Sequence, residues 1–350
     1  MKCASVSAYG NVDEVLKMSF NEERPQRQVG KGEMLVRVQA CSLSPADSIL
    51  MSGSVDKVMA PPSFPYVPGM DLCGIVEDVD QDEKNFKVGD YIVASNAAMP
   101  VGGLAELAII KTKFAKIKPA AITAVEGSAL PGSAMSALLA VQLARVKKGE
   151  RVLVLGGSGG VGTSIVQLLK DAGASFVAAT STDERLLKSL GADRVVDYRA
   201  ENWWEVAEFR VQPFDLIIDC VGVGGRAAWD RAKTGAALRS GWKGGRFVSV
   251  ALADHFEVHT LGQAFALFVP AIWRQVRTKF YPVQPRFKFL MDTGEGPGDH
   301  LSEVLRMVEE GRLKAVLDPA SPFAFTEEGV KGAFRLQASR HAHGKVVVQM

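Results

Sequence analysis

The stretch Val152-Leu-Val-Leu-Gly156-Gly157-Ser158-Gly159-Gly160-Val161-Gly162 decides the fold of this chain. Its apolar start predicts a buried strand, and Gly157, Gly159 and Gly162 form a GxGxxG motif. Apolar residues at 161, 165, 168, 169 and 172 predict an amphipathic helix, because they recur every three or four residues. A glycine loop between a buried strand and a helix is typical of a dinucleotide-binding unit.

Each glycine of this loop has an expected task. We expect Gly157 to permit the tight turn and Gly162 to let the helix pack close to the strand. Bare backbone N–H groups at Gly159 and Gly160 can approach a pyrophosphate, whose charge the positive end of the helix dipole stabilises. The alternative is a glycine-rich turn that binds nothing. The predicted cofactor loop consists of Gly157, Ser158, Gly159, Gly160, Val161 and Gly162.

Strand and helix signals alternate after residue 150. The predicted strands are rich in Val, Ile, Leu and Ala, as expected for a parallel sheet covered on both faces. The right-handed crossover rule then gives an α/β fold with a doubly wound sheet. We predict strands at 151–155, 176–180, 194–197, 216–219 and 246–251, and helices at 133–145, 161–172 and 183–190.

The first 125 residues show a different rhythm, of short strands between turns. Met34–Ala40 alternates apolar and polar residues, which indicates a half-buried strand, and 73–79 and 91–94 are further strands. Four prolines make 60–68 a rigid loop. We expect the final strand, Lys345–Gln349, to return to this first domain. The predicted domains are a β-rich domain at 1–125, completed by 313–350, and a dinucleotide-binding domain at 126–312.

The residues after the second strand of the sheet bear on the choice of dinucleotide. They are Ser181, Thr182, Asp183, Glu184 and Arg185. The two hydroxyls and the guanidinium are suited to a ribose 2′-phosphate, so NADP (NADPH) is favoured. Two alternatives stay open: Asp183 binds a ribose 2′-OH, as in NAD enzymes, or Ser181 and Glu184 form a capping box.

Composition limits the function classes. A formal net charge of +2, from 41 Lys and Arg against 39 Asp and Glu, predicts no specific nucleic-acid binding. The four cysteines form no CxxC pair, which favours a reducing compartment. The start shows no apolar signal core, and Leu261–Trp273, the longest apolar run, is too short to span a bilayer. We therefore expect a cytoplasmic protein, with association to an organelle membrane left open.

One segment, 273–289, combines five positive charges with several aromatic residues and no acid. It predicts a peripheral membrane contact, which would suit a lipophilic acceptor, or a site for an anionic substrate. Single-stranded nucleic acid is a further candidate. The alternative is a solvated face with aromatics packed beneath it, as part of a lid or a subunit contact.

Ordered motifs along nearly the whole chain resemble the zinc-less branch of the medium-chain dehydrogenase/reductase superfamily, the quinone oxidoreductases of the reticulon-interacting and chloroplast-envelope types. The resemblance implies a GroES-like β-rich catalytic domain, built from both ends of the chain, and a Rossmann domain. Homodimers are common in the family, and a homodimer is left open here. The motifs are 68–76 (PGMDLCGIV), 87–90 (KVGD), 102–106 (GGLAE), 130–131 (LP), the glycine loop, 190–193 (LGAD), 196–198 (VDY), 214–219 (FDLIID) and 344–347 (GKVV).

The same resemblance implies that no metal is bound. Zinc enzymes of the superfamily carry a Cys three residues before an Asp, and later Gly-His-Glu. Here Ser44 precedes Asp47, and the later motif reads Gly69-Met70-Asp71. Serine and methionine are poor substitutes for the thiolate and imidazole ligands of catalytic zinc.

The implied activity is hydride transfer from NADPH to a quinone or another α,β-unsaturated carbonyl. The candidates for the catalytic site are Ser44, Asp47, Tyr66 and Ser136. Each has a plainer alternative: Asp47 only orients its neighbours, Tyr66 only packs, and Ser136 is an ordinary helix serine. On the cofactor side, the resemblance places Tyr198 near the 2′-phosphate, and Val221, Gly222 and Lys345 complete the predicted set.

The family pattern Ser-Leu-Asn-Pro-x-Asp-Tyr is altered in this chain. Ser44 and Ser48 stand where the family has Asn and Tyr, so the proton donor is unassigned. Two alternative functions stay open. One is a 2-alkenal or enoyl-thioester reductase, and the other is a non-catalytic NADPH-binding scaffold or redox-sensing protein.

Overall fold

The computed structural model describes residues 1–20, 29–57, 59–61, 63–95, 102–222, 225–250, 258–281, 283–290 and 298–350. The chain divides into two compact units. The first unit comprises Met1–Met135 and Asp292–Met350, and the second comprises Ser136–Met291. No helix within the described ranges is both long enough and apolar enough to cross a membrane.

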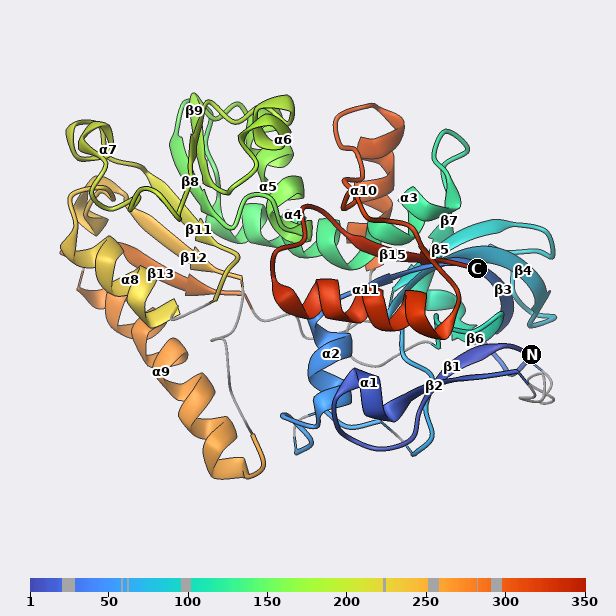
Figure 1. The fold of residues 1–350 in the computed structure, drawn as a ribbon. Coiled ribbons are helices and arrows are strands. Elements are labelled where there is room, and N and C mark those ends of the chain that lie inside the picture. Colours follow the sequence, from blue (N-terminus) through green and yellow to red (C-terminus); the bar gives the residue numbers. More distant parts are fainter. Residues whose placement is uncertain are drawn as a thin grey trace. The chain divides into compact units, whose positions relative to one another are not determined.

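The second unit contains a parallel sheet of six strands in the order β10-β9-β8-β11-β12-β13 (Figure 1). Counted along the chain of this unit, the order is 3-2-1-4-5-6, which is that of a doubly wound Rossmann sheet. The strands are β8 (Arg151–Leu155), β9 (Phe176–Thr180), β10 (Arg194–Val196), β11 (Leu216–Asp219), β12 (Arg246–Ser249) and β13 (Arg286–Phe289). The helices are α5 (Gly160–Asp171), α6 (Glu184–Ser189), α7 (Ala207–Val211), α8 (Gly225–Thr234) and α9 (Leu261–Phe280).

The predicted α/β class is confirmed, and most predicted strands of this sheet are found at or within a residue or two of their expected bounds. The central strands are buried on both faces, which explains their unbroken apolar sequences. β13 was not expected, because its sequence belongs to the basic and aromatic segment 273–289. Its Phe287 is buried and stacks on Phe247 of β12 with ring centroids 5.9 Å apart. The segment is therefore divided between a helix and an edge strand and is not one surface.

The first unit is built on a seven-stranded sheet in the order β14-β15-β3-β4-β5-β7, with β6 paired to β3, and a separate hairpin of β1 and β2. The strands are β1 (Cys3–Val6), β2 (Leu16–Ser19), β3 (Glu33–Leu43), β4 (Asp71–Val79), β5 (Tyr91–Ser95), β6 (Leu107–Lys111), β7 (Ala115–Ile117), β14 (Phe323–Ala324) and β15 (Val346–Gln349). The helices are α1 (Val12–Val15), α2 (Pro45–Ser52), α3 (Ala124–Ala129), α10 (Gly298–Glu309) and α11 (Glu327–Ser339), and α4 (Pro131–Ala144) begins in this unit and ends in the other.

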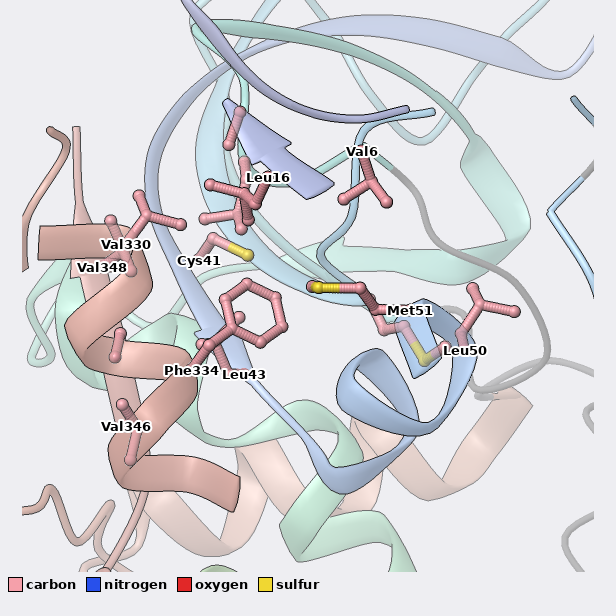
Figure 2. Packing of buried hydrophobic residues seen from close by; sticks show 14 of the residues in the cluster. Val6, Leu16, Cys41, Leu43, Leu50, Met51, Val330, Phe334, Val346 and Val348 are labelled. Atoms are coloured by element: carbon pink, nitrogen blue, oxygen red, sulfur yellow. The ribbon is translucent and has the colours of Figure 1, made fainter. Parts of the chain in front are cut away.

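The two ends of the chain share one core in the first unit. β15 pairs antiparallel with β3, with Val346 opposite Leu43, so the predicted return of the C-terminal strand is confirmed. Figure 2 shows Phe334 of α11 pointing into the core beside Leu43 and Met51. Burial of Leu50 and Met51 in this core anchors α2, the helix that carries the candidate Asp47.

Candidate functional site

The glycine loop lies at the carboxyl end of β8, next to the end of β11, where the strand order of the sheet reverses. Ligands of open α/β sheets bind at such a switch point. The tight turn is made by Gly156, whose φ of +76° favours glycine. Our assignment of the turn to Gly157 was wrong. A Cβ at Gly157 would lie 2.7 Å from the Cβ of Ala179 on β9, so this glycine is required for close packing.

Gly162 and Gly159 have different surroundings. A Cβ at Gly162 would lie 2.2 Å from the carbonyl oxygen of Gly156, which agrees with its expected role in helix–strand packing. Among the residues that the structure describes, a Cβ at Gly159 would meet nothing closer than 3.6 Å. The N–H groups of Gly160, Val161 and Gly162 have no acceptor among the described residues. The loop therefore offers three free donors at the positive end of α5.

The residues after β9 and β10 lie at the same edge of the sheet. Thr180 is tied to the loop, because its Oγ1 accepts from the Gly156 amide at 2.9 Å. The amide of Ser181 donates to the carbonyl of Val196 at 3.0 Å, which joins the ends of the two strands. The edge thus brings Ser181 and Thr182 near the chain that continues to Tyr198.

The first turn of α6 does not form the capping box that the sequence left open as an alternative. Its N-cap is Asp183, whose Oδ1 accepts from the Leu186 amide at 2.8 Å. Ser181 instead accepts from the amide of Asp183 at 2.9 Å. The proposed pair of Ser181 and Glu184 was therefore wrong, and one carboxylate oxygen of Asp183 is used by the helix.

Two cations flank this edge. Arg185 is exposed on α6. Arg199 was missed in the sequence, and its guanidinium lies 6.0 Å from the ring centroid of Tyr198, which is itself about half exposed. The signal for Arg199 was its place directly after Tyr198, three residues beyond the end of β10.

Asp219, a buried carboxylate at the end of β11, was also not predicted as a site residue. Oδ1 of Asp219 accepts from the amides of Val221 at 3.0 Å and Gly222 at 3.4 Å, which shapes the turn after the strand. Oδ2 is buried without a hydrogen-bond partner among the described residues, and burial raises the pKa of this carboxyl. A Cβ at Gly156 would lie 2.8 Å from Val221, so the two loops touch at the switch point.

In the first unit, Ser44 and Asp47 form a closed pair at the start of α2. Oδ2 of Asp47 accepts from the amide and the hydroxyl of Ser44 at 2.9 and 3.0 Å, and Oδ1 accepts from the Gly69 amide at 3.0 Å. Asp47 is fully buried, and desolvation raises its pKa to about 6 against the effect of these hydrogen bonds. The geometry agrees with Asp47 as a group that orients its neighbours, and the hydroxyl proton of Ser44 is committed to it.

Tyr66 lies near this pair. Its ring is buried, and its hydroxyl has no hydrogen-bond partner among the described residues. Burial, and next the charge of Asp47, raises the pKa of the phenol. A buried hydroxyl without a partner is costly, so it points to a ligand that would use it.

The side chains at the position where related enzymes bind zinc do not fit a zinc ion in this chain. Ser44 Oγ and Met70 Sδ lie 4.0 Å apart, so the structure brings together the two positions where zinc enzymes carry Cys and His. Both carboxylate oxygens of Asp47 already accept from N–H or O–H donors. Within the described ranges, no cluster of three or more His, Cys, Asp or Glu side chains suits a metal. We therefore derive no step through a metal.

Lys345 and Ser136 have separate environments. Lys345 is buried in the first unit, where its Nζ donates to the carbonyl of Leu43 at 2.9 Å and lies 3.4 Å from Asp71 Oδ2. Ser42 and Ser95 complete this buried polar cluster around Asp71. Ser136 is half-buried in α4 and belongs to the second unit. The sequence did not indicate the partner of Lys345.

A surface pocket of about 490 Å³ lies elsewhere in the first unit. Lys2, Phe325 and Met350 are among its lining residues. None of the predicted site residues lines it, and we assign it no role.

Comparison with known proteins agrees with this architecture. Residues 30–120 match the family described as alcohol dehydrogenase GroES-like domain, and residues 190–348 match the family described as zinc-binding dehydrogenase. The solved quinone oxidoreductase of Coxiella burnetii superposes with a TM-score of 0.76 at 24% identity, covering 100% of this chain and 99% of that one. At this identity the match shows the fold alone.

Two curated relatives cover almost the whole chain. The NADPH-dependent alkenal/one oxidoreductase, chloroplastic, of Arabidopsis thaliana is 30% identical over 99% of this chain and 79% of its own length. The quinone-oxidoreductase QR1, chloroplastic, of Triphysaria versicolor is 31% identical over 100% of this chain and 98% of its own length. With the GroES-like unit, the Rossmann sheet and its glycine loop, these matches show that the chain is an oxidoreductase of the quinone oxidoreductase-like group in the medium-chain dehydrogenase/reductase superfamily.

Proposed function

We propose that this chain is an NADPH-dependent, zinc-independent reductase that transfers hydride to quinones or other α,β-unsaturated carbonyls. The observation that carries the proposal is the loop at the switch point. Among the described residues, a Cβ at Gly159 would meet nothing closer than 3.6 Å, and the amides of Gly160, Val161 and Gly162 lack acceptors. These donors fit a pyrophosphate. Val221 and Gly222, at the adjoining loop, would bound the same site.

The 2′-phosphate is the second part of the proposal. Ser181, Thr182 and Arg185 would hold it, with Tyr198 and Arg199 at the same edge. Asp183 gives one oxygen to the Leu186 amide, which argues against its use as a ribose ligand. The relative from Arabidopsis thaliana is described as NADPH-dependent, which supports the same choice.

The substrate class follows from the missing Lewis acid ligands. Reduction of a simple ketone develops charge on one oxygen, which zinc stabilises in related enzymes. Ser44 and Met70 cannot supply that ligand set. In a quinone or an enone, hydride adds to an electron-poor carbon, and the charge spreads through the conjugated carbonyl. Bound NADPH would supply the hydride, and one proton completes the two-electron reduction.

We assign the remaining roles, contact with the acceptor and positioning of its neighbours, to side chains of the first unit. The hydroxyl of Tyr66 is the group we propose to meet the acceptor carbonyl, because it is buried and has no partner among the described residues. Asp47 would position Ser44 and the segment at Gly69. Ser44 can accept a hydrogen bond from a ligand, since its own proton goes to Asp47. Ser136 stays a candidate on the cofactor side.

Two alternatives are kept because specific observations favour them. The relative from Arabidopsis thaliana is described as an alkenal/one oxidoreductase, which favours a 2-alkenal reductase, and an enoyl-thioester reductase stays open beside it. Ser44 and Ser48, in place of the family's Asn and Tyr, favour a non-catalytic NADPH-binding protein.

Steady-state oxidation of NADPH with a panel of benzoquinones, 2-alkenals and enoyl-CoA esters tests the proposal. The panel is run before and after treatment with a chelator. We expect turnover of quinones or enones that the chelator does not change. A clear preference for enoyl-CoA would overturn the substrate class, and loss of activity after chelation would overturn zinc independence. Tight NADPH binding without turnover of any acceptor would support the non-catalytic alternative.

A further inference from the structure

Helix α9 uses one face to cover the edge strand of the parallel sheet. Thr278 is buried, and its Oγ1 accepts from the Phe287 amide at 3.0 Å. Gln275 Oε1 accepts from the Phe289 amide at 3.0 Å. The guanidinium of Arg274 lies 4.8 Å from the ring centroid of Phe287. Side chains of this inner face therefore occupy outward N–H groups of β13 that would otherwise be open to pairing.

The opposite face of α9 is apolar and exposed. Trp273 is 66% exposed and lies on the same side as a row of residues at intervals of three or four. At about 100° per residue, these side chains fall within an arc about 100° wide, centred opposite Thr278. Phe265 and Phe280 are 72% and 70% exposed. The row consists of Phe265, Val269, Ile272, Val276 and Phe280. We call this row, with Trp273, the outer stripe.

Cations flank the outer stripe on both sides. The same angular spacing places Arg277 just beyond one border and Lys279 just beyond the other. Neither forms an ion pair with the residues that the structure describes. No Asp or Glu occurs in the sequence from Val258 to Met291. Figure 1 shows α9 running beside β13 at one end and extending past the sheet at the other.

We propose that the outer stripe docks on an anionic lipid surface. Its apolar side chains would enter the boundary between head groups and acyl chains, and Arg277 and Lys279 would reach the phosphates. The charge pattern favours an anionic lipid surface over a second copy of the chain as the binding partner of the outer stripe. A symmetric partner would bring the same cations and no acid from this segment, whereas anionic head groups complement them.

Flotation of the full-length chain with vesicles tests the proposal. One set is pure phosphatidylcholine, and the other contains about 30% phosphatidylserine. The variant Phe265→Ser/Trp273→Ser removes two aromatic groups of the stripe. Trp242→Ser is the matched control, because Trp242 is 74% exposed in the same unit but lies outside the stripe. Arg277→Gln/Lys279→Gln tests the charge, with Lys243→Gln as its control.

We expect the wild-type chain to float with the anionic vesicles and to be released by salt. Phe265→Ser/Trp273→Ser should weaken the partition about tenfold or more, and Arg277→Gln/Lys279→Gln should remove the preference for anionic lipid. The two controls should bind like the wild type. Circular dichroism and the melting temperature should be unchanged in all variants, since the substituted side chains are exposed.

Two results would overturn the proposal. One is a wild-type chain that does not float, or that floats equally with the stripe variant. The other is a dimer in sedimentation that the stripe substitutions dissociate while vesicle binding stays the same. NADPH binding and acceptor reduction without vesicles are expected to be unaffected by these substitutions, so this test and that of the proposed function fail independently.

Discussion

The amide of Gly69 donates to Oδ1 of Asp47 at 3.0 Å, across a separation of 22 residues in the sequence. The bond ties the start of α2 to the segment that precedes β4. Because the amide and the hydroxyl of Ser44 donate to the other carboxylate oxygen, both oxygens of Asp47 accept hydrogen bonds. These hydrogen bonds hold the carboxyl group of Asp47 in place inside the first unit. The stability of the fold therefore depends on whether this carboxyl is protonated.

Asp47 should make the chain less stable as the pH rises. Its pKa rises from 3.8 to about 6 on folding, so the folded state holds the proton more tightly. The stabilisation is complete below the unfolded pKa and is lost as the pH rises through 6, by about 3 kcal/mol. Asp47→Asn should remove this slope, measured as urea unfolding free energy between pH values of about 4 and 7.

Asp80→Asn is the matched control for that experiment. Hydrogen bonds from the amides of Gly32 and Asp82 lower the pKa of this half-buried residue's carboxyl. Its contribution therefore has the opposite sign, because it is lost on acidification. If Asp47→Asn kept the wild-type slope, the buried carboxylate would not be the source of the pH dependence.

Two glycine substitutions separate nucleotide binding from folding. Gly159→Ala places a Cβ in ordinary contact, 3.6 Å from the nearest atom of the described residues, so the melting temperature should be retained. The new methyl group would stand where a pyrophosphate approaches, and we expect about tenfold or greater loss of NADPH affinity in calorimetry. Gly162→Ala, whose Cβ would meet Gly156 at 2.2 Å, should lose about 1–3 kcal/mol of stability as well. Wild-type affinity in Gly159→Ala would contradict the proposed loop.

Tyr66→Phe should lower turnover without lowering stability. The hydroxyl it removes is buried and without a partner among the described residues, so the fold loses no hydrogen bond and sheds a desolvated polar group. If the hydroxyl meets the acceptor carbonyl, kcat/KM should fall about tenfold or more while NADPH affinity stays constant. Unchanged kcat/KM would reduce Tyr66 to a packing residue.

Substitution of Lys345 should lower the stability of the fold more than the affinity for NADPH. Lys345→Met leaves the carboxylate of Asp71 buried without its cation, which typically costs about 3–5 kcal/mol. The double variant Asp71→Asn/Lys345→Met should recover part of that loss, since no charge is then left alone. Denaturant midpoints measure both. A large loss of NADPH affinity in a stably folded Lys345→Met would instead return Lys345 to the cofactor site.

Cofactor selectivity tests the two exposed cations. Arg185→Ala should weaken NADPH about tenfold more than NADH, because only NADPH carries the 2′-phosphate. Arg199→Ala should show the same asymmetry, to a smaller extent. Lys188→Ala, on the same helix as Arg185, serves as the control, since its ammonium donates to the carbonyl of Asp193. Equal effects on both nucleotides would leave Arg185 as a surface residue of α6.

The sequence by itself determined five of the six strands of the parallel sheet in the second unit, and β13 was not among them. Strands such as 151–155 and 216–219 are buried on both faces, so their apolar runs are unbroken and readable. The glycine loop is equally local, since strand, turn and helix signals follow one another in a single stretch. The motifs of the resemblance also singled out Asp47 before any contact was known, whereas Tyr66 was a candidate because it follows the proline-rich loop.

Only the tertiary structure decided which groups meet. The partner of Lys345 is Asp71, 274 residues away, and the cap of α6 proved to be Asp183 and not Ser181. β13 was hidden because an edge strand that α9 covers carries charged and aromatic residues in place of an apolar run. The physical reason is the distance along the chain over which each signal acts. Periodicity is local and indicates which side of a helix or strand is buried. The partner of each buried polar group depends on how segments distant in the sequence pack together.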